Sequence, residues 1–174
     1  MIFRLSQVIV SFLLLVSLNC AAFPDRVTLK NRNLKLSNEQ KLKILFTGFY
    51  RYETEKEMIL QEIIKQGIEE DTSSKITLEI ILQKKDPKYQ YPLLHRVQFL
   101  LTFLSGGIFP SHIRTEQTLT FRYSQSDRII KENEYSVGMD QWRGIPIVIF
   151  MISHWPNKIF KDQLSETTKL EFSE

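Results

Sequence analysis

The sequence predicts an α+β domain, in which a small antiparallel sheet carries one amphipathic helix and two apolar segments flank a hairpin. Apolar and polar residues alternate over residues 42–46, 76–83 and 115–123, which is the period of a half-buried strand. A single apolar stripe at helical spacing falls within residues 58–68. One strand, one helix and then several strands is the order typical of an α+β domain. At 174 residues the chain suits one domain with a substantial core.

The predicted helix follows the strand at 42–46 and the turn residue Gly48. Thr54 and Glu57 have the spacing of a capping box, in which the hydroxyl and the carboxylate satisfy free amides of the first turn. The helix would then bury the stripe that contains Ile59 and Ile63.

The later strands are predicted to form a hairpin, with residues 115–123 returning as 128–137 through a turn at 125–127. Residues 27–29 form a further candidate strand. The tail, 160–174, is predicted to be a short amphipathic helix or a frayed strand.

Composition excludes several classes of function. With 43% hydrophobic and 25% charged residues the chain is ordinary for a globular protein. The formal charge is +3, and it falls to +2 if Arg4 is removed with a leader, so no basic surface for nucleic acid is expected. A single cysteine, Cys20, rules out an internal disulfide and a cysteine-based zinc site.

The first nineteen residues are predicted to be a secretory signal peptide. Arg4 is followed by an apolar run from Val8 to Leu18 that contains only two serines, and Pro24 ends the apolar pattern soon after. The run is shorter than the roughly 20 residues that a membrane-spanning helix needs.

The only cysteine stands directly after this run. Residues 16–20 (VSLNC) resemble the lipobox of bacterial lipoproteins, in which the cysteine thiol is acylated and becomes the new N-terminus. Ser17 and Asn19 depart from the usual Leu and small residue, and this relaxed form resembles the spirochaete version. The resemblance implies lipidation of Cys20, palmitate among the acyl chains, and a place in the outer membrane. More than one acyl chain gives stable anchoring.

Ordinary secretion is the alternative. Cys20, Ala21 and Ala22 offer the small residues that a standard signal peptidase needs, and cleavage would leave a soluble protein that begins at Phe23. Retention of the segment as a buried or anchoring helix is a third interpretation. The predicted organisation is a signal peptide at 1–19, a lipidated N-terminus and tether at 20–41, and one α+β domain at 42–174.

Two apolar segments, 97–113 and 144–157, contain no formally charged residue. One interpretation places both in the core, the first as a buried helix or strand and the second as a central strand covered on both faces. The other makes them a paired tip that contacts a bilayer or an envelope protein, with Trp142 and Trp155 at the ends of the second segment. The residues predicted for that contact are Leu100, Phe103, Ile108, Phe109, Ile149, Phe150 and Trp155.

No catalytic, metal-binding or cofactor-binding pattern is evident. His95, His112 and His154 are widely spaced, and His112 and His154 suit capping or interfacial roles near the apolar segments. The carboxylates near the predicted helix ends suit a solvated face. We therefore expect an envelope lipoprotein with a binding or structural role. The alternatives are a secreted binding protein, a surface adhesin, and an envelope hydrolase with an unrecognised site.

Overall fold

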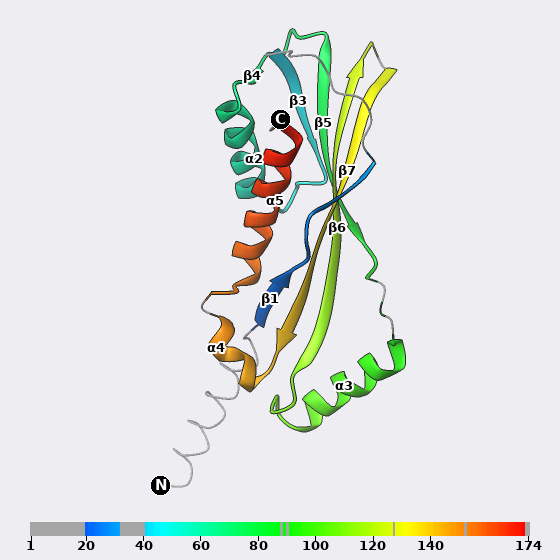
Figure 1. Ribbon diagram of the computed structural model, residues 1–174, viewed down its shortest axis with the longest axis vertical. Helices are drawn as coiled ribbons and strands as arrows, with labels where there is room; N and C mark the ends of the chain where they lie inside the picture. The colour runs from blue at the N-terminus through cyan, green and yellow to red at the C-terminus, as the bar shows by residue number, and fades with distance from the viewer. Residues whose placement is uncertain are drawn as a thin grey trace. The chain divides into compact units, whose positions relative to one another are not determined.

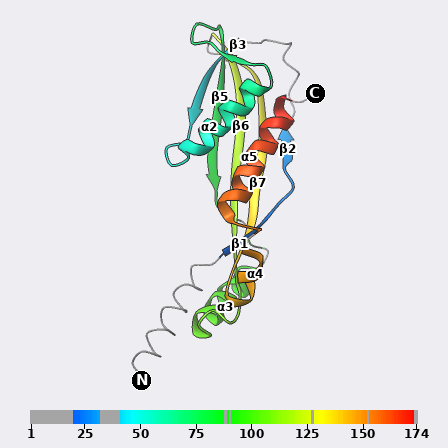
Figure 2. The ribbon, with the colours of Figure 1, turned by 90° about the vertical axis from the view of Figure 1, so that its left-hand side faces the viewer.

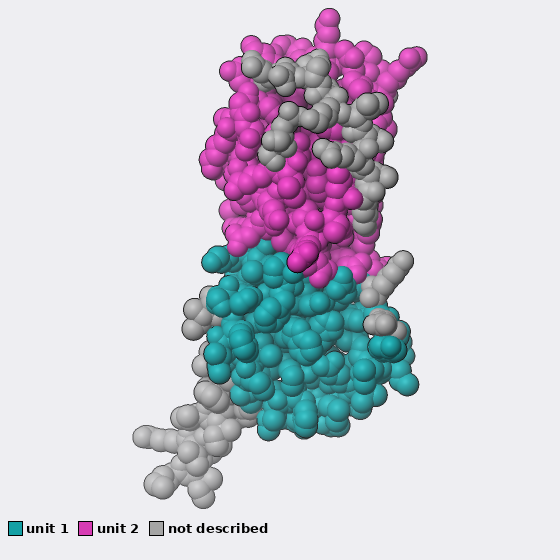
Figure 3. Space-filling view, in the orientation of Figure 1, with its two compact units in different colours: residues 1–24, 87–115, 139–159 teal, residues 25–86, 116–138, 160–174 magenta. Residues whose placement is uncertain are grey.

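A computed structural model describes residues 20–31, 41–87, 89, 91–126, 128–151 and 153–172, and the predicted signal peptide lies outside them. The chain divides into two compact units, coloured teal and magenta in Figure 3. Unit 1 comprises residues 1–24, 87–115 and 139–159, and unit 2 comprises residues 25–86, 116–138 and 160–174. Each unit combines three separate segments, and the domain boundaries given above stay predictions.

The described strands form a sheet in the order β1-β7-β6-β5-β3-β4, with β2 also paired to β7 (Figure 1). Strand β5 (Ile76–Lys85) is antiparallel to β6 (Ser111–Gln125), and β6 neighbours β7 (Arg128–Arg143) as the predicted hairpin requires. Both hairpin strands are longer than expected. The α+β class is confirmed.

The expectation of a wholly antiparallel sheet is wrong. Strand β3 (Lys41–Thr47) lies parallel to β5, and the short β4 (Glu69–Glu70) lies parallel to β3. A parallel neighbour needs a crossover connection, and α2 (Glu53–Lys65) lies on the crossover between β3 and β5.

In unit 2, the core lies between one face of the sheet and two helices, not one. Residues Ile76, Leu78, Ile80 and Leu82 of β5 are buried, and the residues between them are not, as the alternation predicts. Helix α2 lies on the same face of the sheet as α5 (Pro156–Phe172) (Figure 2). The predicted tail is therefore a helix and not a frayed strand. The helices contribute the buried residues Ile59, Ile63, Phe160 and Leu164.

The predicted capping box of α2 is wrong. The helix begins at Glu53, its N-cap residue is Tyr52, and no side chain caps it. The ring of Tyr52 lies 5.4 Å from that of Phe160 on α5. Packing therefore fixes the start of this helix, and Thr54 falls inside the first turn.

Unit 1 is built on the pairing of β1 (Cys20–Pro24) with the end of β7, where Cys20 faces Arg143 and Pro24 faces Met139. Together with β2 (Thr28–Asn31) in unit 2, β1 shows that part of the segment expected to be a tether is strand. The remainder of unit 1 includes α3 (Pro92–Leu104), the short helix η1 (Ile145–Ile147) and α4 (Val148–Met151). The central strand expected within 144–157 is absent from the described residues, because Pro146 starts a helical turn there.

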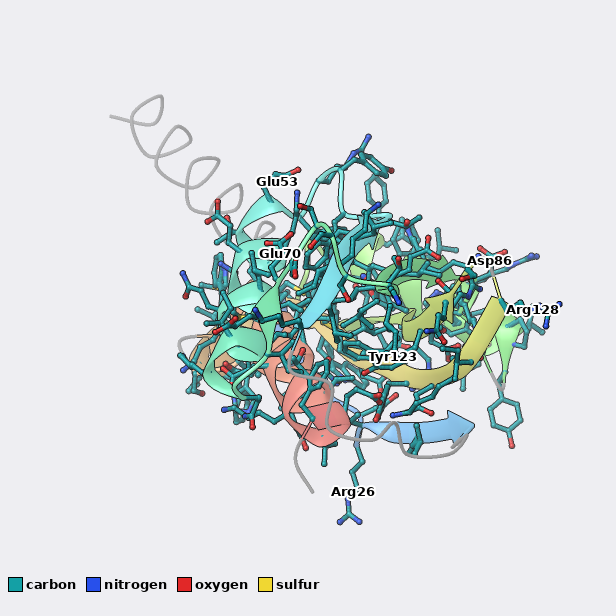
Figure 4. All side chains as sticks on the ribbon, turned by 90° about the horizontal axis from the view of Figure 1, so that it is seen from above. Arg26, Glu53, Glu70, Asp86, Tyr123 and Arg128 are labelled. Carbon is teal, nitrogen blue, oxygen red and sulfur yellow. The ribbon has the colours of Figure 1, made fainter. Side chains whose placement is uncertain are left out.

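A buried carboxylate fastens the end of α5 to the sheet in unit 2. The side chain of Glu171 is fully buried, and Lys131 lies 2.9 Å from it. The hydroxyls of Tyr123 and Tyr135 donate to it at 3.0 and 2.7 Å, and the amide of Asn133 donates at 2.7 Å. Burial, then the charge of Glu171, raises the pKa of Tyr123, so this phenol stays a donor. Figure 4 labels Tyr123 on the sheet.

We predict that Glu171→Ala lowers the free energy of unfolding by about 3–5 kcal/mol, because Lys131 is left buried without its counter-charge. The control is Glu69→Ala, which removes an exposed partner of Lys41 and should cost no more than about 1 kcal/mol. Urea titration of both variants measures the difference. Equal losses would contradict the structural role of Glu171.

Candidate apolar contact surface

Helix α3 is docked by its polar side and exposes its apolar side. None of its thirteen residues is buried. Its three least exposed residues are His95, Gln98 and Thr102, which are spaced so that they share one face of the helix. Viewed down the helix axis at 3.6 residues per turn, the exposed residues occupy an arc of roughly 220°. Phe99 lies at one edge of this arc and Leu94 at the other. A surface helix in water normally has the opposite arrangement.

The polar face of α3 is held by specific hydrogen bonds within unit 1. The side-chain amide of Gln98 donates to the Pro110 carbonyl at 3.0 Å. The hydroxyl of Thr102 donates to the carbonyl of Gln98 at 2.9 Å, one turn earlier in the helix. The hydroxyl of Ser105 accepts from the amide of Phe109 at 3.1 Å and so shapes the loop after the helix. The bond from Gln98 to Pro110 ties the polar side of α3 to the segment before β6, so the opposite side faces outward.

An aromatic cluster holds the first turn of α3. The ring of His95 stacks on Tyr89 at a centroid distance of 4.0 Å, and the hydroxyl of Tyr89 accepts from the amide of Arg114 at 3.1 Å. His112 lies 6.4 Å from His95 and 4.9 Å from Trp142. The capping or interfacial role expected of His112 stays a prediction.

Asp140 lies at the base of the same cluster. One of its carboxylate oxygens lies 2.8 Å from Nε2 of His112 and 3.2 Å from the guanidinium of Arg114. The carboxylate of Asp140 therefore forms a charge-assisted ion pair with Arg114. Among the described residues no group of three His, Cys, Asp or Glu side chains has the geometry of a metal site.

The second apolar segment lies beside the first. The amide of Ile145 donates to the carbonyl of Gly107 at 2.9 Å, which joins the loop after α3 to the start of η1. Gly144 has a φ of 141°, and a Cβ at this position would lie 3.0 Å from the Gly107 oxygen and 3.0 Å from Cα of Pro110. Only glycine allows the two backbones to approach this closely.

Helix α4 packs against β1 and exposes the rest of its surface. The ring of Phe23 lies 6.4 Å from Phe150 and 4.8 Å from His154. The amide of Ala22 donates to the His154 carbonyl at 2.8 Å. Ile149 is nevertheless 80% exposed.

We use the term apolar face of unit 1 for the exposed large hydrophobic residues of α3, of the loop after it, of α4 and of their flanks. All seven residues predicted for membrane or partner contact belong to it. Because all seven side chains are exposed, the interpretation that places them in the core is wrong. An exposed apolar patch of this kind typically marks a contact surface. The face consists of Tyr91, Leu93, Leu94, Val97, Phe99, Leu100, Leu101, Phe103, Leu104, Ile108, Phe109, Ile149, Phe150 and Trp155.

The apolar segment predicted at 97–113 begins after the first three residues of the face, Tyr91, Leu93 and Leu94. Helix α3 begins at Pro92, five residues before the apolar segment was taken to begin, and proline is favoured at a helix start. The exposed cation Arg96 also lies before the predicted segment. The spacing of His95, Gln98 and Thr102 was the signal for the polar side.

The exposed formal charges of unit 1 are all positive among the described residues. Arg96 on α3, Arg143 at the end of β7 and Lys158 in α5 are exposed, whereas Asp140 is half-buried in its ion pair. Unit 2 differs, because its exposed charges have both signs, as Glu53, Glu70, Asp86 and Arg128 show in Figure 4.

Cys20 is the first residue of β1 and is half-buried. Its Sγ lies 3.7 Å from Oε1 of Gln141, whose side-chain amide donates to the hydroxyl of Thr115 at 3.3 Å. The two residues that follow it, Ala21 and Ala22, are fully buried. Cys20 is therefore already part of the paired strand, opposite Arg143 of β7.

Comparison with known proteins adds little to this description. No family model matches the chain, and no curated protein matches it. Among solved structures, a minor lipoprotein from Acinetobacter baumannii is 6% identical with a TM-score of 0.46, over 76% of this chain and 87% of that one. A PelC dodecamer from Paraburkholderia phytofirmans is 6% identical with a TM-score of 0.39, over 86% and 98%. A common fold does not follow from TM-scores below 0.5.

None of the described helices has the length and apolar content needed to cross a membrane. At thirteen residues α3 is about 20 Å long, from a rise of 1.5 Å per residue.

Substitution of two phenylalanines distinguishes an outward face from a core. Phe103 is 78% exposed and Phe121 is fully buried. We predict that Phe103→Ala changes the free energy of unfolding by less than about 0.5 kcal/mol, as for other surface positions. Phe121→Ala should cost about 3–5 kcal/mol. Urea titration of both variants provides the comparison, and a comparable loss for Phe103→Ala would show that α3 packs inward.

Proposed function

We propose that the chain is an exported envelope lipoprotein, anchored to a membrane through acylated Cys20, with a binding or structural role rather than a catalytic one. The observation that carries the proposal is the presence of Cys20 and the apolar face in the same compact unit. An anchor at Cys20 would bring unit 1 to the membrane.

The position of Cys20 in β1 favours cleavage before the cysteine. Cleavage at this point keeps the whole of β1, including the register of Cys20 with Arg143. Ordinary secretion with a new N-terminus at Phe23 would remove three of the five β1 residues. It would also remove Ala21 and Ala22, which are fully buried, and the bond from Ala22 to His154. A mature chain that begins at Cys20 fits unit 1 better.

A short link between lipid and fold follows from this proposal. If the acylated residue is the first residue of a paired strand, few degrees of freedom separate the acyl chains from unit 1. A flexible tether would let the domain leave the bilayer, whereas this link would hold it close. Placement in the outer membrane rests on the lipobox resemblance alone.

The binding or structural role rests on the apolar face. Its side chains are exposed within unit 1, and a patch of this extent favours contact with lipid or with another envelope protein. The polar side chains of His112, Arg114 and Asp140 are engaged with one another, and the ring of His95 packs beside His112 and supports α3. Their arrangement suits a structural task.

Mass spectrometry of the mature N-terminus from a membrane fraction tests the anchor. We expect an N-terminal Cys20 carrying acyl chains. Cys20→Ser should prevent acylation and either release the protein or leave uncleaved precursor. Ser17→Ala, which keeps the cysteine, serves as the control and should still be acylated. A free N-terminus at Phe23 in the soluble fraction would contradict the proposal.

A further inference from the structure

We propose that the apolar face of unit 1 binds the surface of a bilayer that contains anionic phospholipid, and that it does so without the acyl anchor. The inference deepens the proposed function and rests on it, because only an exported chain would present this face to an envelope membrane. The proposed partner of the apolar face is lipid.

The shape of the face favours a fluid occupant. The exposed side chains of α3 cover more than half of the helix circumference, and those of the following loop and of α4 extend the same apolar character. A protein partner would need a deep groove to cover such a helix. Acyl chains and headgroups surround an embedded helix on every side that the protein leaves free. Helices that lie in the plane of the interface bind membranes in this way.

Exposed aromatic residues flank α3 and α4, and they suit the boundary between headgroups and acyl chains. Tyr91 precedes α3 and Trp155 follows α4, and both rings are exposed. Tyr and Trp are enriched at the boundary between headgroups and acyl chains, because each ring has an apolar body and a polar group. The apolar side chains between them, such as Leu100, Phe103 and Ile149, would lie deeper.

The charges select the kind of lipid. Arg96 lies within the outward arc of α3, and Arg143 and Lys158 are exposed elsewhere in unit 1. Long basic side chains can cover apolar surface with their methylenes while their charges remain at the headgroups. No exposed acidic side chain is present in the described part of unit 1 to oppose an anionic surface. Each cation near such a surface adds roughly fivefold to the affinity.

Vesicle flotation tests the inference with the chain from residue 20 onward, which carries every described residue, and with Cys20→Ser so that no acyl chain contributes. Cooperative thermal unfolding confirms that this chain is folded. The probes are vesicles of phosphatidylcholine and vesicles with three parts in ten phosphatidylglycerol. We expect at least tenfold tighter binding to the second kind, and weaker selectivity at high salt.

Two pairs of variants separate the contributions. Phe103→Ser with Ile149→Ser should abolish binding to both kinds of vesicle. Arg96→Gln with Lys158→Gln should lower affinity for the anionic vesicles at least tenfold and leave the weak binding to neutral vesicles unchanged. The matched controls are Ile129→Ser and Arg128→Gln, an exposed apolar residue and an exposed cation of unit 2, and neither should change binding.

Three results would overturn the inference: no binding to either vesicle, equal affinity for both, or a stable dimer that hides the face and stays in solution. These outcomes are distinct from failure of the proposed function. An acylated Cys20 found in cells with no vesicle binding by the Cys20→Ser chain would leave the anchor standing and remove the second contact. A free N-terminus at Phe23 with selective vesicle binding would do the reverse.

Discussion

The polar docking of α3 is the constraint on which the rest of unit 1 depends. Gln98 bonded to Pro110, together with His95 stacked on Tyr89, turns the polar side of the helix inward. The apolar residues then have no direction left except outward. In water this arrangement costs free energy, because burial of a large apolar side chain is worth roughly 1.5–3 kcal/mol and α3 forgoes it many times. Apolar surroundings for the outward side of α3, as we propose, would remove this cost.

Unit 2 follows ordinary rules, and the contrast is informative. Its helices α2 and α5 bury apolar residues against alternating strands, and its charged residues point outward or form pairs. The buried carboxylate of Glu171, which is costly to bury alone, is satisfied by four donors. The same chain therefore contains one unit suited to water and one with an inverted surface helix. A general excess of hydrophobic residues does not explain the difference, since the exposed residues concentrate in unit 1.

The sequence predicted those parts of the fold whose periodicity is local. Strand β5 and the hairpin were found because each alternation reports one buried face. The parallel pairing of β3 was not found, because pairing partners depend on a crossover that no local pattern reveals. The seven residues predicted for contact, from Leu100 to Trp155, are exposed in the structure, whereas the sequence left open whether they were buried. An apolar run has the same sequence pattern whether it packs in a core or faces lipid. Only the spacing of the polar residues from His95 to Thr102 indicated which side of the helix is exposed.

The accessibility of a spin label at position 103 to oxygen and to a water-soluble nickel chelate shows whether the outward side of α3 faces lipid. The chain Cys20→Ser, Phe103→Cys offers a single thiol, and the label is examined on vesicles that contain phosphatidylglycerol. If the outward side of α3 faces lipid, dissolved oxygen should relax the label strongly and a water-soluble nickel chelate should hardly reach it. A label that the chelate reaches as freely as it reaches an exposed site in solution would contradict lipid contact at this position.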